Sequence, residues 1–177
     1  MGKQALRHLS DRDPTFTMTQ FNLIHDLLDA GYLLEAQHRF AESFADFPAA
    51  WHTRVTWLEA RLAAAEGDVE RAELAYREVE REYRQASRPL EVAMVCLDLS
   101  RLYLSRGRED EIPPLMETVL QTFASDPHPV PAHVVTAFEH LRQAAAVRTL
   151  KVATLARLSH HLRDLRTRPR GPEQAPS

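Results

Sequence analysis

Apolar residues recur three or four positions apart along most of this chain, the spacing that places them on one face of an α-helix. Phe21, Ile24 and Leu28 form one such stripe, and Leu58 and Leu62 belong to another. No segment alternates apolar and polar residues in the way that a half-buried β-strand requires. The pattern therefore predicts an all-α protein.

Breaks in this pattern divide the chain into eight helices. Gly31, Gly67 and Gly107 each follow an apolar stripe, where a left-handed residue can end a helix and glycine adopts that conformation at least cost. Proline-containing segments interrupt other connections, because proline lacks an N–H and disfavours helical geometry in the residue before it. The predicted helices cover residues 15–30, 32–46, 49–66, 68–86, 88–106, 110–124, 131–145 and 147–167.

The three glycines also frame a repeating unit. They stand 36 and 40 residues apart, within the range typical of helical repeat arrays. A small residue five positions after the glycine would let the two helices of a hairpin approach closely, and a large residue four positions later would fill the gap to the next hairpin. The residues that define this repeat are Gly31, Ala36, Phe40, Gly67, Ala72, Tyr76, Tyr103 and Gly107.

This frame resembles the tetratricopeptide repeat, a helix-turn-helix unit of about 34 residues. The resemblance implies a TPR-like α-α superhelix, a solenoid of helical hairpins with a C-terminal capping helix. One repeat domain is expected at residues 15–167, with an N-terminal extension at 1–14 before it and a disordered tail at 168–177 after it. Within the domain, the three repeat units are expected at 17–48, 53–87 and 93–125, followed by capping helices at 131–167.

Two features depart from the family pattern. The tryptophan expected in the first helix of each unit occurs only in the second unit, displaced to Trp57. Pro113 and Pro114 stand at the start of the second helix of the third unit, where Ile112 replaces the small residue. Because proline is tolerated only in the first turn, this helix should start late.

A second resemblance covers the end of the chain. The segments VAMVCLDLSRLYLSRGR and VVTAFEHLRQAAAVRTLKVATLARLSHHLRDLR are similar to the C-terminal repeat region of bacterial multidomain signalling and transcription-regulatory proteins. This resemblance implies a protein-protein interaction or scaffold module, an adaptor in a bacterial regulatory complex.

The tetratricopeptide frame implies a concave face lined by the first helix of each unit, which would bind a peptide or a helix. It places on that face Phe21, His25, Arg54, Trp57, Arg61, Leu97, Arg101 and Leu104. Arginines and aromatics would suit an acidic or amphipathic partner. The alternative is that these side chains simply pack against neighbouring helices. The family's clamp for a C-terminal carboxylate does not carry over, because Phe21, Trp57 and Leu97 occupy its key positions.

Composition is consistent with a single cytoplasmic domain. The chain has 177 residues, of which 44% are hydrophobic, enough for one continuous core. No apolar run approaches the roughly 20 residues of a membrane span, so no membrane contact is expected. Cys96 is the only cysteine, which excludes an internal disulfide, and its apolar neighbours predict that it is buried. A homo-oligomer is left open, since three repeats leave apolar surface to cover.

Charge is unevenly distributed. The net charge is −3, yet residues 142–177 contain eight Lys or Arg and two acidic residues. The last helix is interpreted first as a solvated capping helix. The alternative function is a nucleic-acid-linked transcription regulator that uses a basic C-terminal patch. That patch would comprise Arg157, Arg163, Arg166, Arg168 and Arg170.

Enzyme signatures are missing. The chain has nine histidines but no HExxH, zinc-ligand spacing, phosphate-binding glycine loop or GxSxG. Glu35 and His38 form a single copy of a half-motif that di-iron bundles need twice. His160 and His161 are adjacent on a predicted helix and point about 100° apart, which argues against joint chelation. The sequence therefore predicts no catalytic residue, metal or cofactor, and a partner that is another protein or peptide.

Overall fold

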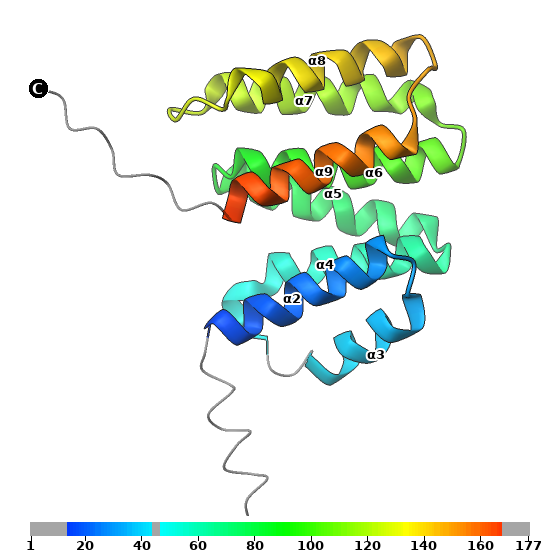
Figure 1. Cartoon of the computed structure of the whole chain (residues 1–177), viewed down its shortest axis with the longest axis vertical. Coiled ribbons are helices and arrows are strands. Elements are labelled where there is room, and N and C mark those ends of the chain that lie inside the picture. The colour runs from blue at the N-terminus through cyan, green and yellow to red at the C-terminus, as the bar shows by residue number, and fades with distance from the viewer. Residues whose placement is uncertain (1–13, 44–46, 168–177) are drawn as a thin grey trace, which may run out of the picture. The chain divides into compact units, whose positions relative to one another are not determined.

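The computed structural model describes residues 14–43 and 47–167 (Figure 1). The regular structure of these residues is entirely helical, with no β-strand among them. The all-α class predicted from the sequence is therefore confirmed. None of the described helices combines the length and hydrophobicity that a membrane span needs. The expected N-terminal extension up to residue 13 and the expected tail at 168–177 lie outside the described residues.

Each predicted helix has a counterpart in the structure. The α-helices are α2 (Pro14–Asp29), α3 (Leu33–Ser43), α4 (His52–Glu66), α5 (Val69–Gln85), α6 (Pro89–Ser105), α7 (Ile112–Ser125), α8 (Ala132–Ala146) and α9 (Val152–Thr167). Two 3-10 turns, η2 (Ala49–Trp51) and η3 (Glu109–Glu111), precede α4 and α7. α7 starts after the predicted residue 110 and holds its prolines in the first turn, as expected for a late start.

Five of these helices end in the same kind of turn. A backbone N–H just beyond the helix donates to the carbonyl five residues earlier, at N···O distances of 2.8–2.9 Å. The donor and acceptor pairs are Tyr32 and Leu27, Asp68 and Ala63, Arg88 and Tyr83, Arg108 and Tyr103, and Thr149 and Ala144. Such a bond satisfies a carbonyl that the helix end would otherwise leave unpaired.

The residue before each donor has a positive φ angle. Three of them are the glycines that the sequence indicated, Gly31, Gly67 and Gly107, while the other two are Ser87 at 52° and Arg148 at 54°. Arginine rarely adopts this conformation, so no local signal indicated a turn at Arg148. For this reason α9 begins at Val152 and not at the predicted residue 147.

The described residues form two compact units, with the boundary in the last turn of α5. The first unit extends to Glu82, and the second starts at Tyr83. In the first unit, α4 packs against both α2 and α3. The Thr53 hydroxyl near the start of α4 donates to Glu82 near the end of α5 at 2.5 Å, as expected for an antiparallel hairpin.

Burial in the first unit follows the repeat frame at most positions. Ala36 and Ala72, the small residues after the glycines, are fully buried. Tyr76 is also buried, whereas Phe40 is only half-buried. Removing the ring of Phe40 should therefore cost less than removing that of Tyr76, because less apolar surface leaves the core.

In the second unit, α7 packs against α6 and α8, while α9 packs along α6 (Figure 1). Residues 131–167, expected as capping helices, therefore pack in two different places. α8 has its closest backbone contacts with α7, and α9 has them with α6, while the side chains of His133 on α8 and His161 on α9 also meet. The core of this unit includes Phe138, whose ring meets that of Phe123 edge to face at 5.5 Å. Cys96 is buried, as its sequence context predicted.

The turn at Gly31 provides a test of this helix-end geometry. Gly31 has a φ angle of 82°, and a Cβ atom built there would meet no heavy atom within 4 Å. Gly31→Ala should therefore lower the free energy of unfolding by about 1 to 2 kcal/mol through backbone strain alone. Gly31→Asn should cost less, because asparagine tolerates the left-handed conformation. Urea denaturation measures both, and equal losses would contradict this explanation.

Candidate functional site

In the first unit, three of the residues predicted to bind a partner form an aromatic cluster. The ring of His25 lies 4.4 Å from that of Phe21 and 5.0 Å from that of Trp57, measured between centroids. All three side chains are at most 5% exposed. The structure thus brings these residues together, but as packed core side chains and not as an open binding face.

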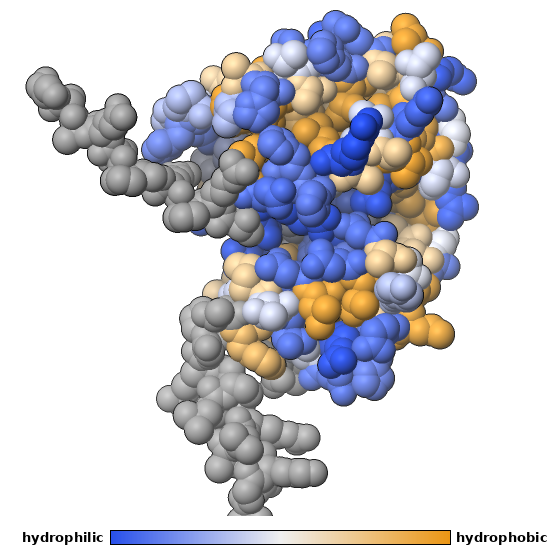
Figure 2. Space-filling view, viewed as in Figure 1, coloured by the Kyte–Doolittle hydropathy of each residue, from blue (hydrophilic) through white to orange (hydrophobic). Residues whose placement is uncertain are grey.

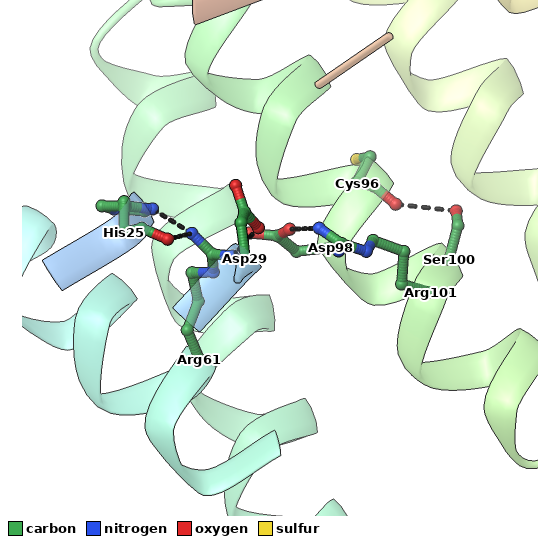
Figure 3. A network of polar contacts seen from close by, with 7 residues as sticks. All are labelled: His25, Asp29, Arg61, Cys96, Asp98, Ser100 and Arg101. Carbon is green, nitrogen blue, oxygen red and sulfur yellow. Dashed lines mark hydrogen bonds and ion pairs between the residues drawn. The ribbon is translucent and has the colours of Figure 1, made fainter. Parts of the chain in front are cut away.

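Arg61 joins this cluster through charged contacts (Figure 3). Its guanidinium donates hydrogen bonds to the Asp29 carboxylate and to Nδ1 of His25. Because a guanidinium only donates, Nδ1 of His25 is the acceptor in this contact. Arg61 is only 8% exposed. Its side chain is therefore committed to internal bonds that a partner's carboxylate would have to displace.

The remaining predicted residues also make local contacts. The guanidinium of Arg54 lies over the Trp51 ring, 4.4 Å from its centroid, a cation–π geometry. On α6, Leu97 is fully buried and Leu104 is half-buried. Arg101 lies 3.6 Å from Asp98 on the same helix (Figure 3). These burial values favour the alternative of ordinary packing over a peptide groove on the first helices.

The basic C-terminal patch is only partly described. Arg157 is exposed, and Arg163 and Arg166 are half-buried. Arg168 and Arg170 lie outside the described residues. An acidic residue, Asp164, interrupts the basic run and lies 3.7 Å from His160. Within the described part of α9, positive charge is therefore not concentrated on one exposed face.

A predominantly apolar hollow in the described part of the second unit is a groove between α8 and α9. Its volume is about 260 Å³. It is lined by Ala137, His140, Leu141, Ala144, Thr149, Leu150, Lys151, Thr154 and Leu158. Hydrophobic surface is visible in the band between these two helices in Figure 2. The backbones of these two helices have their closest contacts elsewhere, α8 with α7 and α9 with α6, and the groove lies between them.

Two exposed valines border the turn at the end of this groove. Val147 is 68% exposed and Val152 is 49% exposed. Lys151, between α8 and α9, supplies a positive charge beside the apolar lining. Such a surface can take aliphatic side chains and pair with one carboxylate next to them. Sequence reasoning missed this groove because residues 147–151 were predicted to be helical.

A second, more polar hollow of about 310 Å³ lies between the end of α5 and α7. The hydroxyl groups that α7 contributes to it are already used within that helix. Thr122 donates to the Thr118 carbonyl at 2.8 Å, and Ser125 donates to the Gln121 carbonyl at 2.8 Å. These bonds leave fewer donors for a ligand, so the α8–α9 groove is the better candidate for binding.

Metal-ligating side chains lie close together at several places in the described residues, and at one of them three such side chains meet. His52, Glu78 and Glu82 form one group in the first unit. His133 and His161 form a pair in the second unit, with their Nε2 atoms 3.1 Å apart. His160 turns instead to Asp164, so the two adjacent histidines of α9 point to different partners, as the helical geometry predicted.

No family model, curated protein or solved structure matches this chain.

The ion pair between the buried Arg61 and Asp29 should contribute more to stability than fully exposed pairs do. Arg61→Met should lower the free energy of unfolding by about 2 kcal/mol, because the Asp29 carboxylate and Nδ1 of the buried His25 both lose the hydrogen bonds that the guanidinium donates. Arg39→Met is the control, since Arg39 pairs with Glu35 at 3.0 Å on an exposed surface. The control should cost at most about 1 kcal/mol. Urea denaturation compares them, and similar losses would show that the Arg61 interactions are weak.

Proposed function

We propose that this chain is a protein-binding module built from tetratricopeptide-like helical hairpins, which binds an amphipathic helical segment of a partner in the α8–α9 groove. The observation that carries this proposal is the apolar groove itself, with Lys151 in its lining and an exposed valine on each side of the adjoining turn. Monomeric proteins rarely leave such apolar surface clustered without a use in binding.

The repeat assignment rests on the recurring hairpin turn. The frame built on Gly31, Gly67 and Gly107 coincides with helix ends that share one hydrogen-bond pattern. Buried alanines follow two of these glycines at the position where helices must approach closely. These features support a tetratricopeptide-like repeat and, by that resemblance, an adaptor in a bacterial regulatory complex.

The chemistry of the groove defines the partner. Leu141, Leu150 and Leu158 supply apolar surface, and Ala144 leaves room for an inserted side chain. A helix with aliphatic residues on one face and an acidic residue beside them would bury the first against the leucines and bring the second to Lys151. This partner agrees with the acidic or amphipathic peptide expected from the sequence, although the binding surface differs.

This proposal replaces the first-helix face as the binding surface, for a physical reason. Substituting Arg61 with an acidic residue would place a negative charge against Asp29 inside the first unit. Reduced binding in such a variant would therefore report damaged folding as readily as a damaged interface. Ala144 and Lys151 reduce this ambiguity, because Ala144 is half-buried and Lys151 is exposed.

The groove can be tested by selecting helical peptides against the full chain from a displayed random library. Selected peptides should be amphipathic and contain an acidic residue. Ala144→Trp should fill the groove and weaken binding at least about 10-fold, and Lys151→Glu should weaken it by reversing the charge at the edge. Fluorescence anisotropy measures the dissociation constants.

Leu74→Ser is the matched control for the peptide experiment. Leu74 is 74% exposed in the first unit and does not line the groove. This variant should bind the selected peptides as tightly as the wild type does. Failure to select any peptide, or binding by Ala144→Trp equal to that of the wild type, would contradict the proposed site.

Nucleic-acid binding through the basic end is the second candidate, supported by the excess of eight basic over two acidic residues in 142–177 and by exposed Arg157. Affinity for generic duplex DNA should then fall steeply with salt, because binding to phosphates releases counterions. Replacing Arg157, Arg168 and Arg170 by serine should reduce the log–log slope by about 1 for each arginine that pairs with a phosphate. Salt-independent or undetectable binding by the wild-type chain would remove this candidate.

A further inference from the structure

The α4–α5 hairpin brings three metal-ligating side chains together. His52 is the first residue of α4, and Glu78 and Glu82 lie one turn apart near the end of α5. One ligand atom from each of the three lies within 4.8 Å of the others. We propose that His52, Glu78 and Glu82 form a binding site for a divalent transition-metal ion of the zinc class.

The donor set matches the coordination chemistry of zinc. Zinc binds imidazole nitrogen and carboxylate oxygen at about 2.0 to 2.2 Å, and a site with three protein ligands leaves a fourth position for water. These bond lengths place tetrahedral ligand atoms about 3.3 to 3.6 Å apart. Small side-chain rotations close the remaining distance, because His52 is exposed and not held by core packing.

The electrostatics of the hairpin also favour a cation at this place. Glu78 and Glu82 carry like charges one helical turn apart, an arrangement that destabilises a helix. Among the described residues, neither carboxylate pairs with a lysine or arginine side chain, and the side chains of Glu78 and His52 make no hydrogen bond. A divalent ion would neutralise this repulsion and use lone pairs that no other group occupies.

A neighbouring residue orients one of the ligands. The Thr53 hydroxyl donates to Oε2 of Glu82 at 2.5 Å and leaves Oε1 free to bind an ion. Hydrogen bonds of this kind fix the direction of a ligand and tune its affinity for metal. The same hydrogen bond also joins the two helices that supply the ligands, so an ion bound here would link the start of α4 to the end of α5.

The experiment is a titration of Co²⁺, a spectroscopic substitute for Zn²⁺, into the full chain. Trp51 precedes His52, so a bound transition-metal ion should quench tryptophan emission. The expected result is saturable quenching by one ion per chain, reversed by Zn²⁺. Glu78→Gln and Glu82→Gln should each weaken the affinity at least about 10-fold, and Thr53→Val should weaken it by about 10-fold. Glutamine keeps the size of glutamate, and circular dichroism checks that each variant remains folded.

Two controls separate this site from other surface groups. Glu42→Gln alters an exposed His38–Glu42 pair on α3, which offers only two ligands. His133→Gln removes one member of the histidine pair in the second unit. Both variants should show the same quenching as the wild type. Absence of saturable quenching in the wild type, or equal weakening by a control and by Glu78→Gln, would overturn the proposal.

Discussion

A helix that ends in a left-handed residue turns its chain back, because the N–H beyond the turn bonds to a carbonyl of the last helical turn. In this protein that bond recurs at five helix ends, from Leu27 to Ala144. It brings amphipathic helices that follow one another in sequence side by side, where their apolar faces can be buried. The α4–α5 hairpin, the groove after α8 and the helix boundaries all follow from this local geometry.

The aromatic cluster of the first unit consists of residues whose types suggested a binding surface but which pack in the core. Phe21, His25 and Trp57 occur at helical spacing with Arg61, a combination that also occurs at interfaces. In the structure the rings pack on each other, and the guanidinium bonds to Asp29 and His25. A buried arginine needs such partners, since an unpaired charge in the core is very unfavourable. This charge therefore links two helices of the core.

In the second unit, the position of α9 leaves a groove at the surface, whereas the side chains of the aromatic cluster fill the core of the first unit. A helix that capped the last hairpin would cover the apolar side of α8. Since α9 has its closest backbone contacts with α6 instead, a groove remains between α8 and α9, next to the turn that carries the exposed Val147 and Val152. The turn at Arg148 makes this change of direction possible, because it separates α9 from α8 and moves the start of α9 from the predicted residue 147 to Val152. The best candidate for a binding surface thus arises from the packing of a single helix.

The sequence by itself determined the all-α class, the positions of the helices and three of the five left-handed turns. These features depend on the spacing of apolar residues and on glycine, which act over a few residues and can be read locally. The left-handed turns at Ser87 and Arg148 were not predicted, because neither serine nor arginine commonly adopts a positive φ angle. Only the tertiary structure decided that α9 packs along α6, that Arg61 is buried against Asp29, and that His52 meets Glu78 and Glu82. Each of these pairings joins residues more than 20 positions apart, and it depends on which helix faces fit together, which local periodicity does not specify.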